Sequence, residues 1–259
     1  MGIVNENSTK PLFIKIYYNE IELGTATGFQ IHQGHKYLVT NWHVVSGRNL
    51  ITKQPLNNQG AIPNRLLVRY KKFIDSDDFE WTEQEISLVD ENGNKMWYEH
   101  PEYGDKVDVA VIPLELYPKY QHYKERFNHD IRYELDVTDN VFVLGFPLGY
   151  TVKSKNEPHA VWTSGVVASD PSLNLVVNKE EVPAFLIDSK TRQGQSGSPV
   201  IYYSGKGLDL HPSHGGMRLG GVPFMKEIGI YSGRINADSD LGYVWKWSII
   251  KEIIDAIDL

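Results

Sequence analysis

Hydrophobic residues along this chain fall into short segments, which clusters of Gly, Asn, Asp and Pro separate. The segments are rich in Val, Ile, Tyr and Phe, a composition that between turn formers is typical of β-strands. We expect strands at 13–18, 28–32, 37–40, 66–70, 107–112 and 141–145 in the first half, and at 159–167, 184–187, 200–203, 218–224, 227–231 and 242–245 in the second. The pattern predicts an all-β protein.

Only the end of the chain has a helical pattern. Trp247, Ile250, Ile254 and Ile257 recur at the spacing that places them on one helix face, with Ile253 alongside. Elsewhere, three longer stretches interrupt the strand pattern: 71–104, 115–133 and 203–220. Long loops in a compact domain are usually functional, so we expect these insertions either to shape access to a site or to cover a surface.

Length and composition narrow the class of protein. A chain of 259 residues can form two domains of roughly 100 residues each, and 41% hydrophobic residues can fill two cores. The net charge of −7, without a basic run, argues against a nucleic acid bound through its phosphates. The absence of cysteine excludes disulfides and thiolate metal ligands.

Targeting and metal signals are also absent from the sequence. No apolar run approaches the roughly 18 residues of a membrane span, and the first residues lack the basic segment and apolar core of a secretory signal. We therefore expect a cytoplasmic protein without a membrane partner. His211 and His214 have the spacing of a metal pair, but no further ligand clusters with them, so no metal site is predicted.

Three polar residues stand in contexts that favour nucleophilic catalysis. Ser196 lies in the turn Gly-Gln-Ser-Gly over 194–197, His43 follows an apolar segment and Asp108 precedes one. A serine hydroxyl is a weak nucleophile, and it needs an imidazole to accept its proton and a carboxylate to orient that imidazole. Each residue alone has an ordinary alternative, as a turn serine, a core histidine or a strand cap. All three together predict a catalytic triad.

The order and the surroundings of the three residues point to one family. The order His, Asp, Ser, with 65 residues from His43 to Asp108 and 88 from Asp108 to Ser196, differs from that of α/β-hydrolases and subtilisins. The three segments resemble the chymotrypsin-like serine peptidases, most closely the bacterial HtrA-type and glutamyl-endopeptidase branches. The stretches 143–149 and 163–167 also resemble the first hairpin of the second barrel in the HtrA-type branch.

The resemblance spans residues 24–234 and implies a fold and a site. The expected fold is two six-stranded antiparallel β-barrels with a C-terminal α-helix: residues 1–135 carry the histidine and the aspartate, and residues 136–259 carry the serine. The resemblance also implies an oxyanion hole made by the backbone N–H groups of Gly194 and Ser196. It implies no cofactor.

Two positions depart from the digestive members of the family. Gln195 stands where they have an aspartate that pairs with a new N-terminal amine, so we do not expect activation by propeptide cleavage. Ser198 replaces the second glycine of the digestive motif, as it does in glutamyl endopeptidases.

The sequence does not decide which substrate side chain the specificity pocket prefers. The resemblance places Lys190 at the pocket base, with Tyr231 and the substrate-binding segment Ser232, Gly233, Arg234 opposite. If Lys190 or Arg234 points inward, the pocket favours Asp or Glu before the scissile bond. If both point into solvent, the pocket is apolar, as in HtrA-type enzymes. Glutamyl endopeptidases carry a histidine at the position of Tyr231, so this chain departs from their pattern.

The expected function is that of a bacterial, cytoplasmic serine endopeptidase acting on proteins or peptides, with a regulatory protein as a further partner. Ser196 attacks the peptide carbonyl, His43 acts as general base and Asp108 orients His43. The alternative is a latent protease-like binding module whose cleft opens only with a partner or an oligomer. A purely structural β-domain would require the triad to be a coincidence.

Overall fold

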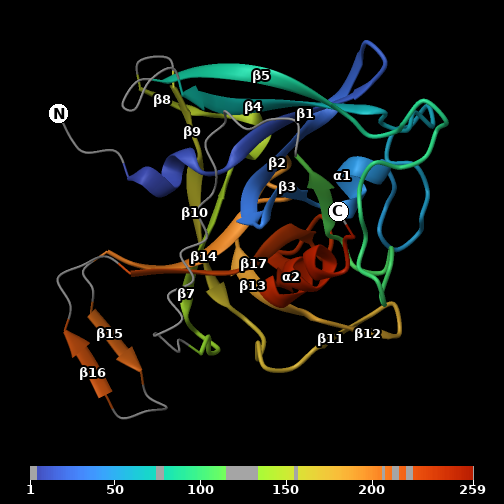
Figure 1. The fold of residues 1–259 in the computed structure, drawn as a ribbon. Helices are drawn as coiled ribbons and strands as arrows, with labels where there is room; N and C mark the ends of the chain where they lie inside the picture. Colours follow the sequence, from blue (N-terminus) through green and yellow to red (C-terminus); the bar gives the residue numbers. More distant parts are fainter. Residues whose placement is uncertain are drawn as a thin grey trace.

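The computed structural model describes residues 5–73, 79–114, 134–154, 157–205, 208–211, 216–219 and 224–258. Its strands form a six-stranded sheet in the first half of the chain and a closed six-stranded barrel in the second half (Figure 1). A short helix follows the last strand. The all-β fold with a C-terminal helix, predicted from the sequence, is confirmed.

The first sheet has the strand order β5-β4-β1-β2-β3-β6. Its strands are β1 (Leu12–Tyr18), β2 (Ile21–Gln33), β3 (His35–Thr40), β4 (Arg65–Phe73), β5 (Phe79–Ser87) and β6 (Ala110–Pro113). Strand β2 serves two partners, because its first part pairs with β1 and its second part pairs with β3. Ile14, Leu38 and Val68 are fully buried in one cluster on the inner face of this sheet. Tyr37 and Val39 of β3 are buried in a second cluster, so this strand is buried on both faces, which explains its continuous apolar run.

The second half closes into a barrel with the order β10-β13-β18-β17-β14-β7. Its strands are β7 (Asn140–Gly145), β10 (Val161–Val167), β13 (Ala184–Ser189), β14 (Pro199–Ser204), β17 (Phe224–Arg234) and β18 (Leu241–Lys246). Val143, Phe185 and Val244 pack in its core. Closure leaves these strands without a free edge.

The predicted insertions contain regular structure. Residues 71–104 include β5, which pairs with β4 along its whole length. Its glutamates do not disrupt the sheet, because Glu83 and Glu85 each form a 2.9 Å ion pair with an arginine of β4. Residues 203–220 include the hairpin of β15 (Leu208–His211) and β16 (Gly216–Leu219). The third insertion, 115–133, lies outside the described residues.

The remaining elements are short. Two more hairpins pair β8 (Val152–Ser154) with β9 (Glu157–His159) and β11 (Leu175–Val177) with β12 (Glu180–Val182). The helical elements are η1 (Glu6–Thr9), α1 (Trp42–Ser46), η2 (Pro147–Gly149) and α2 (Trp247–Asp255). Strand β6 ends at Pro113 and β7 begins at Asn140, so the predicted boundary at 135/136 falls between the two sheets.

The first described residues pack on the barrel formed by the second half of the chain. The Ser8 carbonyl accepts a 2.8 Å hydrogen bond from the N–H of Ala160, and its Oγ accepts a 2.9 Å hydrogen bond from the Trp162 indole. The start of the chain is therefore part of the structural unit that the second half of the chain forms.

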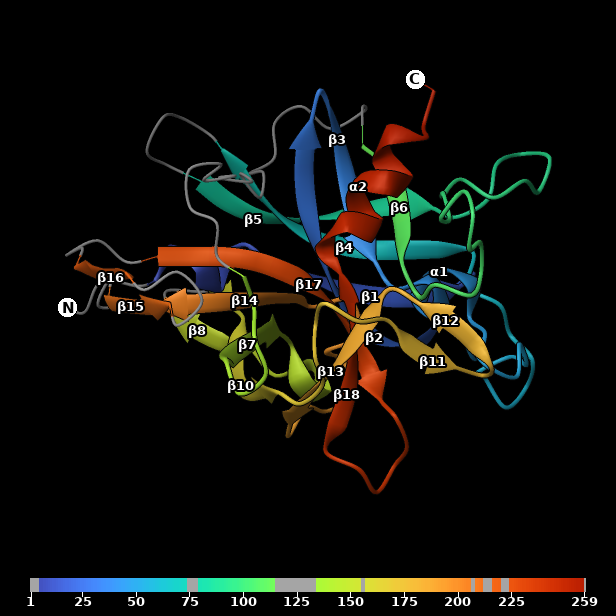
Figure 2. The ribbon, with the colours of Figure 1, turned by 90° about the horizontal axis from the view of Figure 1, so that it is seen from below.

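Helix α2 packs against both halves of the molecule. It contacts β6 of the first sheet and β17 and β18 of the barrel (Figure 2). The Trp247 ring stacks on Phe29 of β2 with ring centroids 5.7 Å apart, and Val109 and Trp245 belong to the same cluster. The predicted apolar face is the buried one, and Ile257 lies just beyond the helix, partly buried.

Candidate active site

His43 lies in the first turn of α1, directly after β3 ends. Asn41, at the N-cap position, is extended with φ −78° and ψ 150°, and its side chain does not cap the helix. Its Nδ2 instead donates a 2.7 Å hydrogen bond to the backbone carbonyl of Asp108. An amide suited to helix capping therefore holds the segment that carries Asp108 against the helix that carries His43.

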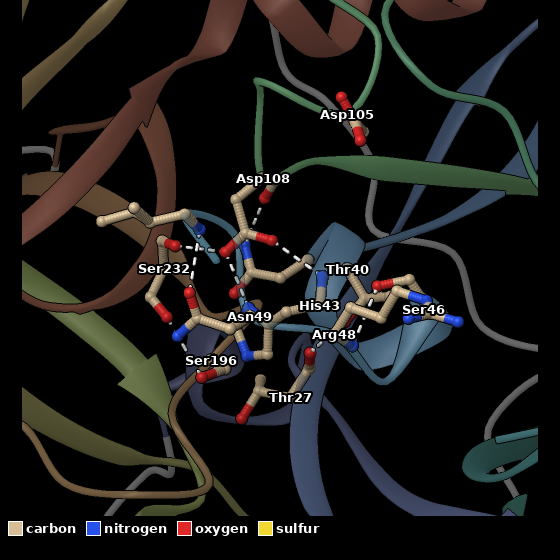
Figure 3. Close-up of polar contacts among 12 residues, drawn as sticks. Thr27, Thr40, His43, Ser46, Arg48, Asn49, Asp105, Asp108, Ser196 and Ser232 are labelled. Atoms are coloured by element: carbon tan, nitrogen blue, oxygen red, sulfur yellow. Dashed lines mark hydrogen bonds and ion pairs between the residues drawn. The ribbon is translucent and has the colours of Figure 1, made fainter. Parts of the chain in front are cut away.

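Asp108 is a buried carboxylate that contacts His43 twice. Its Oδ1 accepts the backbone N–H of His43 at 2.8 Å, and its Oδ2 lies 2.7 Å from Nδ1 of the imidazole. The Ser232 hydroxyl also donates to Oδ2. The side chain of His43 lies between Asp108 and Ser196 (Figure 3). These contacts turn Nδ1 toward the carboxylate and leave Nε2 for another partner.

The close pair shifts both pKa values. Burial acts to lower the pKa of His43, but the charge of Asp108 and its hydrogen bond outweigh burial and raise that pKa above its ordinary value. Burial acts to raise the pKa of Asp108, but the charge of His43 and the hydrogen bonds from His43 and Ser232 lower it. Asp108 is therefore ionised at neutral pH, and His43 is a stronger base than a free imidazole.

Ser196 lies in a turn with glycine at two strained positions. Gly194 and Gly197 have φ values of 93° and 85°, which side chains of L-residues disfavour. A Cβ added to Gly197 would lie 2.1 Å from the carbonyl oxygen of Thr27. The glycines of the predicted motif thus permit both the turn and its close approach to the first sheet.

Gln195 anchors the same turn inside the barrel. The residue is fully buried, and its Oε1 accepts the backbone N–H of Arg192 at 2.8 Å. Its Nε2 donates a 2.9 Å hydrogen bond to Oγ1 of Thr163 on β10. A neutral amide therefore fixes the turn from the position directly before Ser196.

Thr27 of β2 attaches the turn to the first sheet. Its N–H donates to the Ser196 carbonyl at 2.9 Å, and its hydroxyl donates to the Gly194 carbonyl at 2.8 Å. The same hydroxyl accepts the backbone N–H of Phe146 at 3.2 Å, and the Thr27 carbonyl accepts the Thr40 hydroxyl at 2.9 Å. The sheet that carries the histidine thereby positions the serine.

The Ser196 hydroxyl donates a 3.1 Å hydrogen bond to the backbone carbonyl of Ser232. This is the contact that its Oγ makes among the described residues; no hydrogen bond joins it to His43 in this part of the chain. The Ser196 hydroxyl must leave the Ser232 carbonyl before it can donate to the imidazole.

Two backbone N–H groups at the turn are available to a ligand. The N–H groups of Gly194 and Ser196 have no acceptor among the residues that the structure describes. The Gln193 carbonyl accepts the Leu148 N–H at 2.6 Å, and in a planar trans peptide the N–H of Gly194 points the opposite way. Gly194 and Ser196 line one cavity together with His43.

Three cavities meet at this group of residues. The first, of about 400 Å³, has a mixed lining of polar residues and apolar ones such as Ile16, Leu23 and Val44. The second, of about 230 Å³, is bounded by His43 and Asp108 and by apolar side chains. The third, of about 410 Å³, adjoins Ser196 on the other side. A site open on several sides can hold an extended ligand.

The predicted pocket residues divide into two groups. Tyr231 lines the third cavity, Ser232 lines the second, and Gly233 and Arg234 lie between the two and line both. Lys190 is exposed and belongs to none of the three cavities. The buried Thr191, next in the chain, lines the third cavity instead. Sequence reasoning missed Thr191, as it missed Thr27 and Asn41, because no local pattern marks them.

The described residues contain neither a cluster of metal ligands nor a helix that could span a membrane. Among the described residues, no group of three or more His, Cys, Asp or Glu side chains is arranged to hold a metal ion. His214 lies outside the described residues, and His211 ends strand β15. The described helices are too short or too polar to span a membrane.

A family model for a trypsin-like peptidase domain matches residues 26–207, which include His43, Asp108 and Ser196. The chain belongs to the trypsin-like peptidase family. None of the curated proteins compared with this peptidase matches it. A bacterial origin and a cytoplasmic location stay predictions.

Solved structures of proteases share the fold of this peptidase. The inactive form of the Rv3671c protease matches with a TM-score of 0.51 at 17% identity, over 98% of this chain and 91% of that one. The active form of this M. tuberculosis protease matches with a TM-score of 0.52 at 17% identity, over 97% and 82%. The serine endoprotease from Yersinia pestis has a TM-score of 0.52 at 12% identity, over 96% of this chain and 62% of that one.

Proposed function

We propose that this peptidase is a serine endopeptidase that cleaves proteins or peptides through Ser196, His43 and Asp108. The observation that carries the proposal is the double contact between Asp108 and His43. It leaves Nε2 as the ring nitrogen that can accept a proton when the other nitrogen donates to the carboxylate. The raised pKa of His43 strengthens this base.

The first half of the reaction forms an acyl-enzyme. The Ser196 Oγ bonds to the carbonyl carbon of the substrate while its proton passes to Nε2 of His43. The negative charge on the substrate oxygen is stabilised by the N–H groups of Gly194 and Ser196, each of which contributes about 10²–10³ in rate in comparable sites. The C–N bond then breaks, and the proton on His43 passes to the departing amine.

The second half hydrolyses the ester on Ser196. A water oxygen bonds to the ester carbonyl carbon and gives a proton to His43, and the same two N–H groups stabilise the new oxyanion. The bond to Oγ then breaks, and His43 returns the proton to Ser196. The products are an amine and a carboxylic acid, and no cofactor takes part.

The resting hydrogen bond between Ser196 and Ser232 gives substrate binding a role in starting the reaction. The carbonyl of Ser232 lies on the edge of the cleft, and a substrate backbone N–H that donates to it would compete with the Ser196 hydroxyl. A displaced hydroxyl can rotate toward His43. Ser196 lines two cavities, and a third adjoins His43 and Asp108; space on both sides of the serine favours cleavage within a chain rather than at its end.

A fluorophosphonate probe tests this function. The wild-type protein should be labelled on Ser196 and should cleave an unfolded protein substrate internally, whereas Ser196→Ala should do neither. A folded wild-type protein that is neither labelled nor active would contradict the proposal.

A latent peptidase is the second candidate, and the hydrogen bond of the Ser196 hydroxyl to Ser232 instead of His43 favours it. In that case labelling should depend on a partner protein or on oligomerisation. Comparing the labelling rate of the isolated protein at low and high concentration, and with added cell extract, separates the two candidates.

A further inference from the structure

The charged side chains that line the third cavity, next to Ser196, are all positive. Arg192 and Arg234 are among its eleven lining residues, and none of the eleven is an aspartate or a glutamate. The Arg192 guanidinium donates to the carbonyl of the neighbouring Thr191 at 2.8 Å. None of the ion pairs between described residues uses the Arg234 guanidinium, so its charge is available to a ligand.

The wall of this cavity presents a fixed pair of hydroxyl groups. The hydroxyls of Thr191 and Tyr231 are hydrogen-bonded to each other, and both residues are buried. The ring of Tyr231 packs over Gly242 of the paired strand β18, where an added Cβ would lie 2.5 Å from the ring. Glycine at 242 thus makes room for the tyrosine.

The hydroxyl pair keeps one unused proton. Two hydroxyls carry two protons, and their mutual hydrogen bond uses one, so the other can be donated to a ligand. Burial acts to raise the pKa of Tyr231, which outweighs the hydrogen bond of Thr191 and the charge of Arg234, so the phenol stays protonated at neutral pH. Arg234 lines the same cavity as the two hydroxyl-bearing residues.

The identity of the fitting side chain follows from these groups. An aliphatic side chain would displace water from the hydroxyl pair and from Arg234 without replacing its hydrogen bonds, which disfavours its binding. A lysine or arginine side chain would be repelled by the two guanidinium groups. A carboxylate accepts the spare O–H proton and forms a charge-assisted hydrogen bond with Arg234.

We infer that the third cavity binds an aspartate or glutamate side chain directly before the scissile bond, with Arg234 as the specificity-determining residue. The inference rests on the proposed peptidase function for the position of the scissile bond. It assigns the acidic preference to Arg234 and not to Lys190: both residues are exposed, but only Arg234 lines the cavity.

Matched peptides that differ only at the residue before the scissile bond test the inference. The value of kcat/KM should be about 10–10²-fold higher for Asp over Asn and for Glu over Gln, the range of one charge-assisted hydrogen bond. Arg234→Gln should remove most of this difference, whereas Lys190→Gln, which deletes the same charge nearby, should retain it. Equal rates for acid and amide peptides, or an unchanged preference in Arg234→Gln, would overturn the inference.

Binding to a protein that cannot turn over separates this inference from the proposed function. The same uncleaved peptides are titrated into Ser196→Ala and into Ser196→Ala with Arg234→Gln by calorimetry. Tighter binding of the acid peptides that disappears with Arg234→Gln supports the pocket even if the wild type proves inactive. Cleavage by the wild type without any acid preference in rate or binding would leave the function standing and remove the pocket.

Discussion

Thr27 is predicted to be a positioning residue for the nucleophile turn. Thr27→Val keeps the shape of the side chain but deletes a hydroxyl that bonds two buried backbone groups, the Gly194 carbonyl and the Phe146 N–H. Each buried group left unpaired costs about 1–3 kcal/mol, so the free energy of unfolding should fall by about 2–6 kcal/mol. At roughly 2–4 °C per kcal/mol for a chain of this size, Tm should fall by about 4–24 °C.

The assay combines thermal unfolding with the rate of fluorophosphonate labelling. The Gly194 carbonyl lies in the chain between the two oxyanion N–H groups, those of Gly194 and Ser196. If its release lets the turn shift so that one of these N–H groups no longer reaches the oxyanion, labelling should slow by up to about 10²–10³. Thr27→Ser, which restores the hydroxyl, should recover most of both effects. Thr82→Val is the matched control, because Thr82 lies on β5 in the same sheet without a side-chain hydrogen bond to a described residue. The reasoning is refuted if Thr27→Val and Thr82→Val agree within about 0.5 kcal/mol and label equally fast.

Four further predictions concern the triad and its turn. Ser196→Ala and His43→Ala should each lower kcat by about 10⁴–10⁶, and the double variant should lose little more; additive losses would contradict a joint mechanism. Because the base must be neutral and the pKa of His43 is raised, kcat/KM should rise with pH through an apparent pKa above 6.5. Asp108→Asn removes the charge that raises this pKa, so the acid limb should move to lower pH and the rate should fall by about 10⁴; an unmoved limb would argue against the pair. Gly197→Ala should lower stability by about 2–4 kcal/mol in thermal unfolding, and more than Gly149→Ala, which has a φ of 74° but no atom within 4 Å of the added Cβ; equal losses would argue against the close contact.

The strands were predictable wherever one face is buried. The predicted segments 13–18 and 242–245 match β1 and β18 to within a residue at each end. The first part of β2 was missed because it is mostly exposed or half-buried and lacks an apolar alternation. Strand β5 was missed because its charges are neutralised by arginines on β4, which a local reading of the sequence does not consider. Helix α1 has only five residues, too few to show a helical period.

The site was predictable where a motif is local. The segments around the serine, histidine and aspartate carry their own signals, but Thr27 acts through contacts with residues 119 and 167 positions away. The choice between Lys190 and Thr191 depends on the path of the loop after β13. That path is set by the Thr191 N–H, which donates to the Ser189 carbonyl at 2.8 Å, and by the Ser189 hydroxyl, which donates to the Ser164 carbonyl at 2.8 Å. Counting back from the nucleophile cannot reveal which neighbour turns inward.

The position of α2 also determines when the site can form during synthesis. His43, Asp108 and Ser196 leave the ribosome well before β18, which pairs with the strand that carries Ser232, and before α2, which packs on both halves. A nascent chain that ends before residue 241 therefore contains every reacting group but lacks the elements that close the barrel and cover the shared core. The arrangement of the three proposed reacting groups therefore depends on elements that follow all of them in the chain.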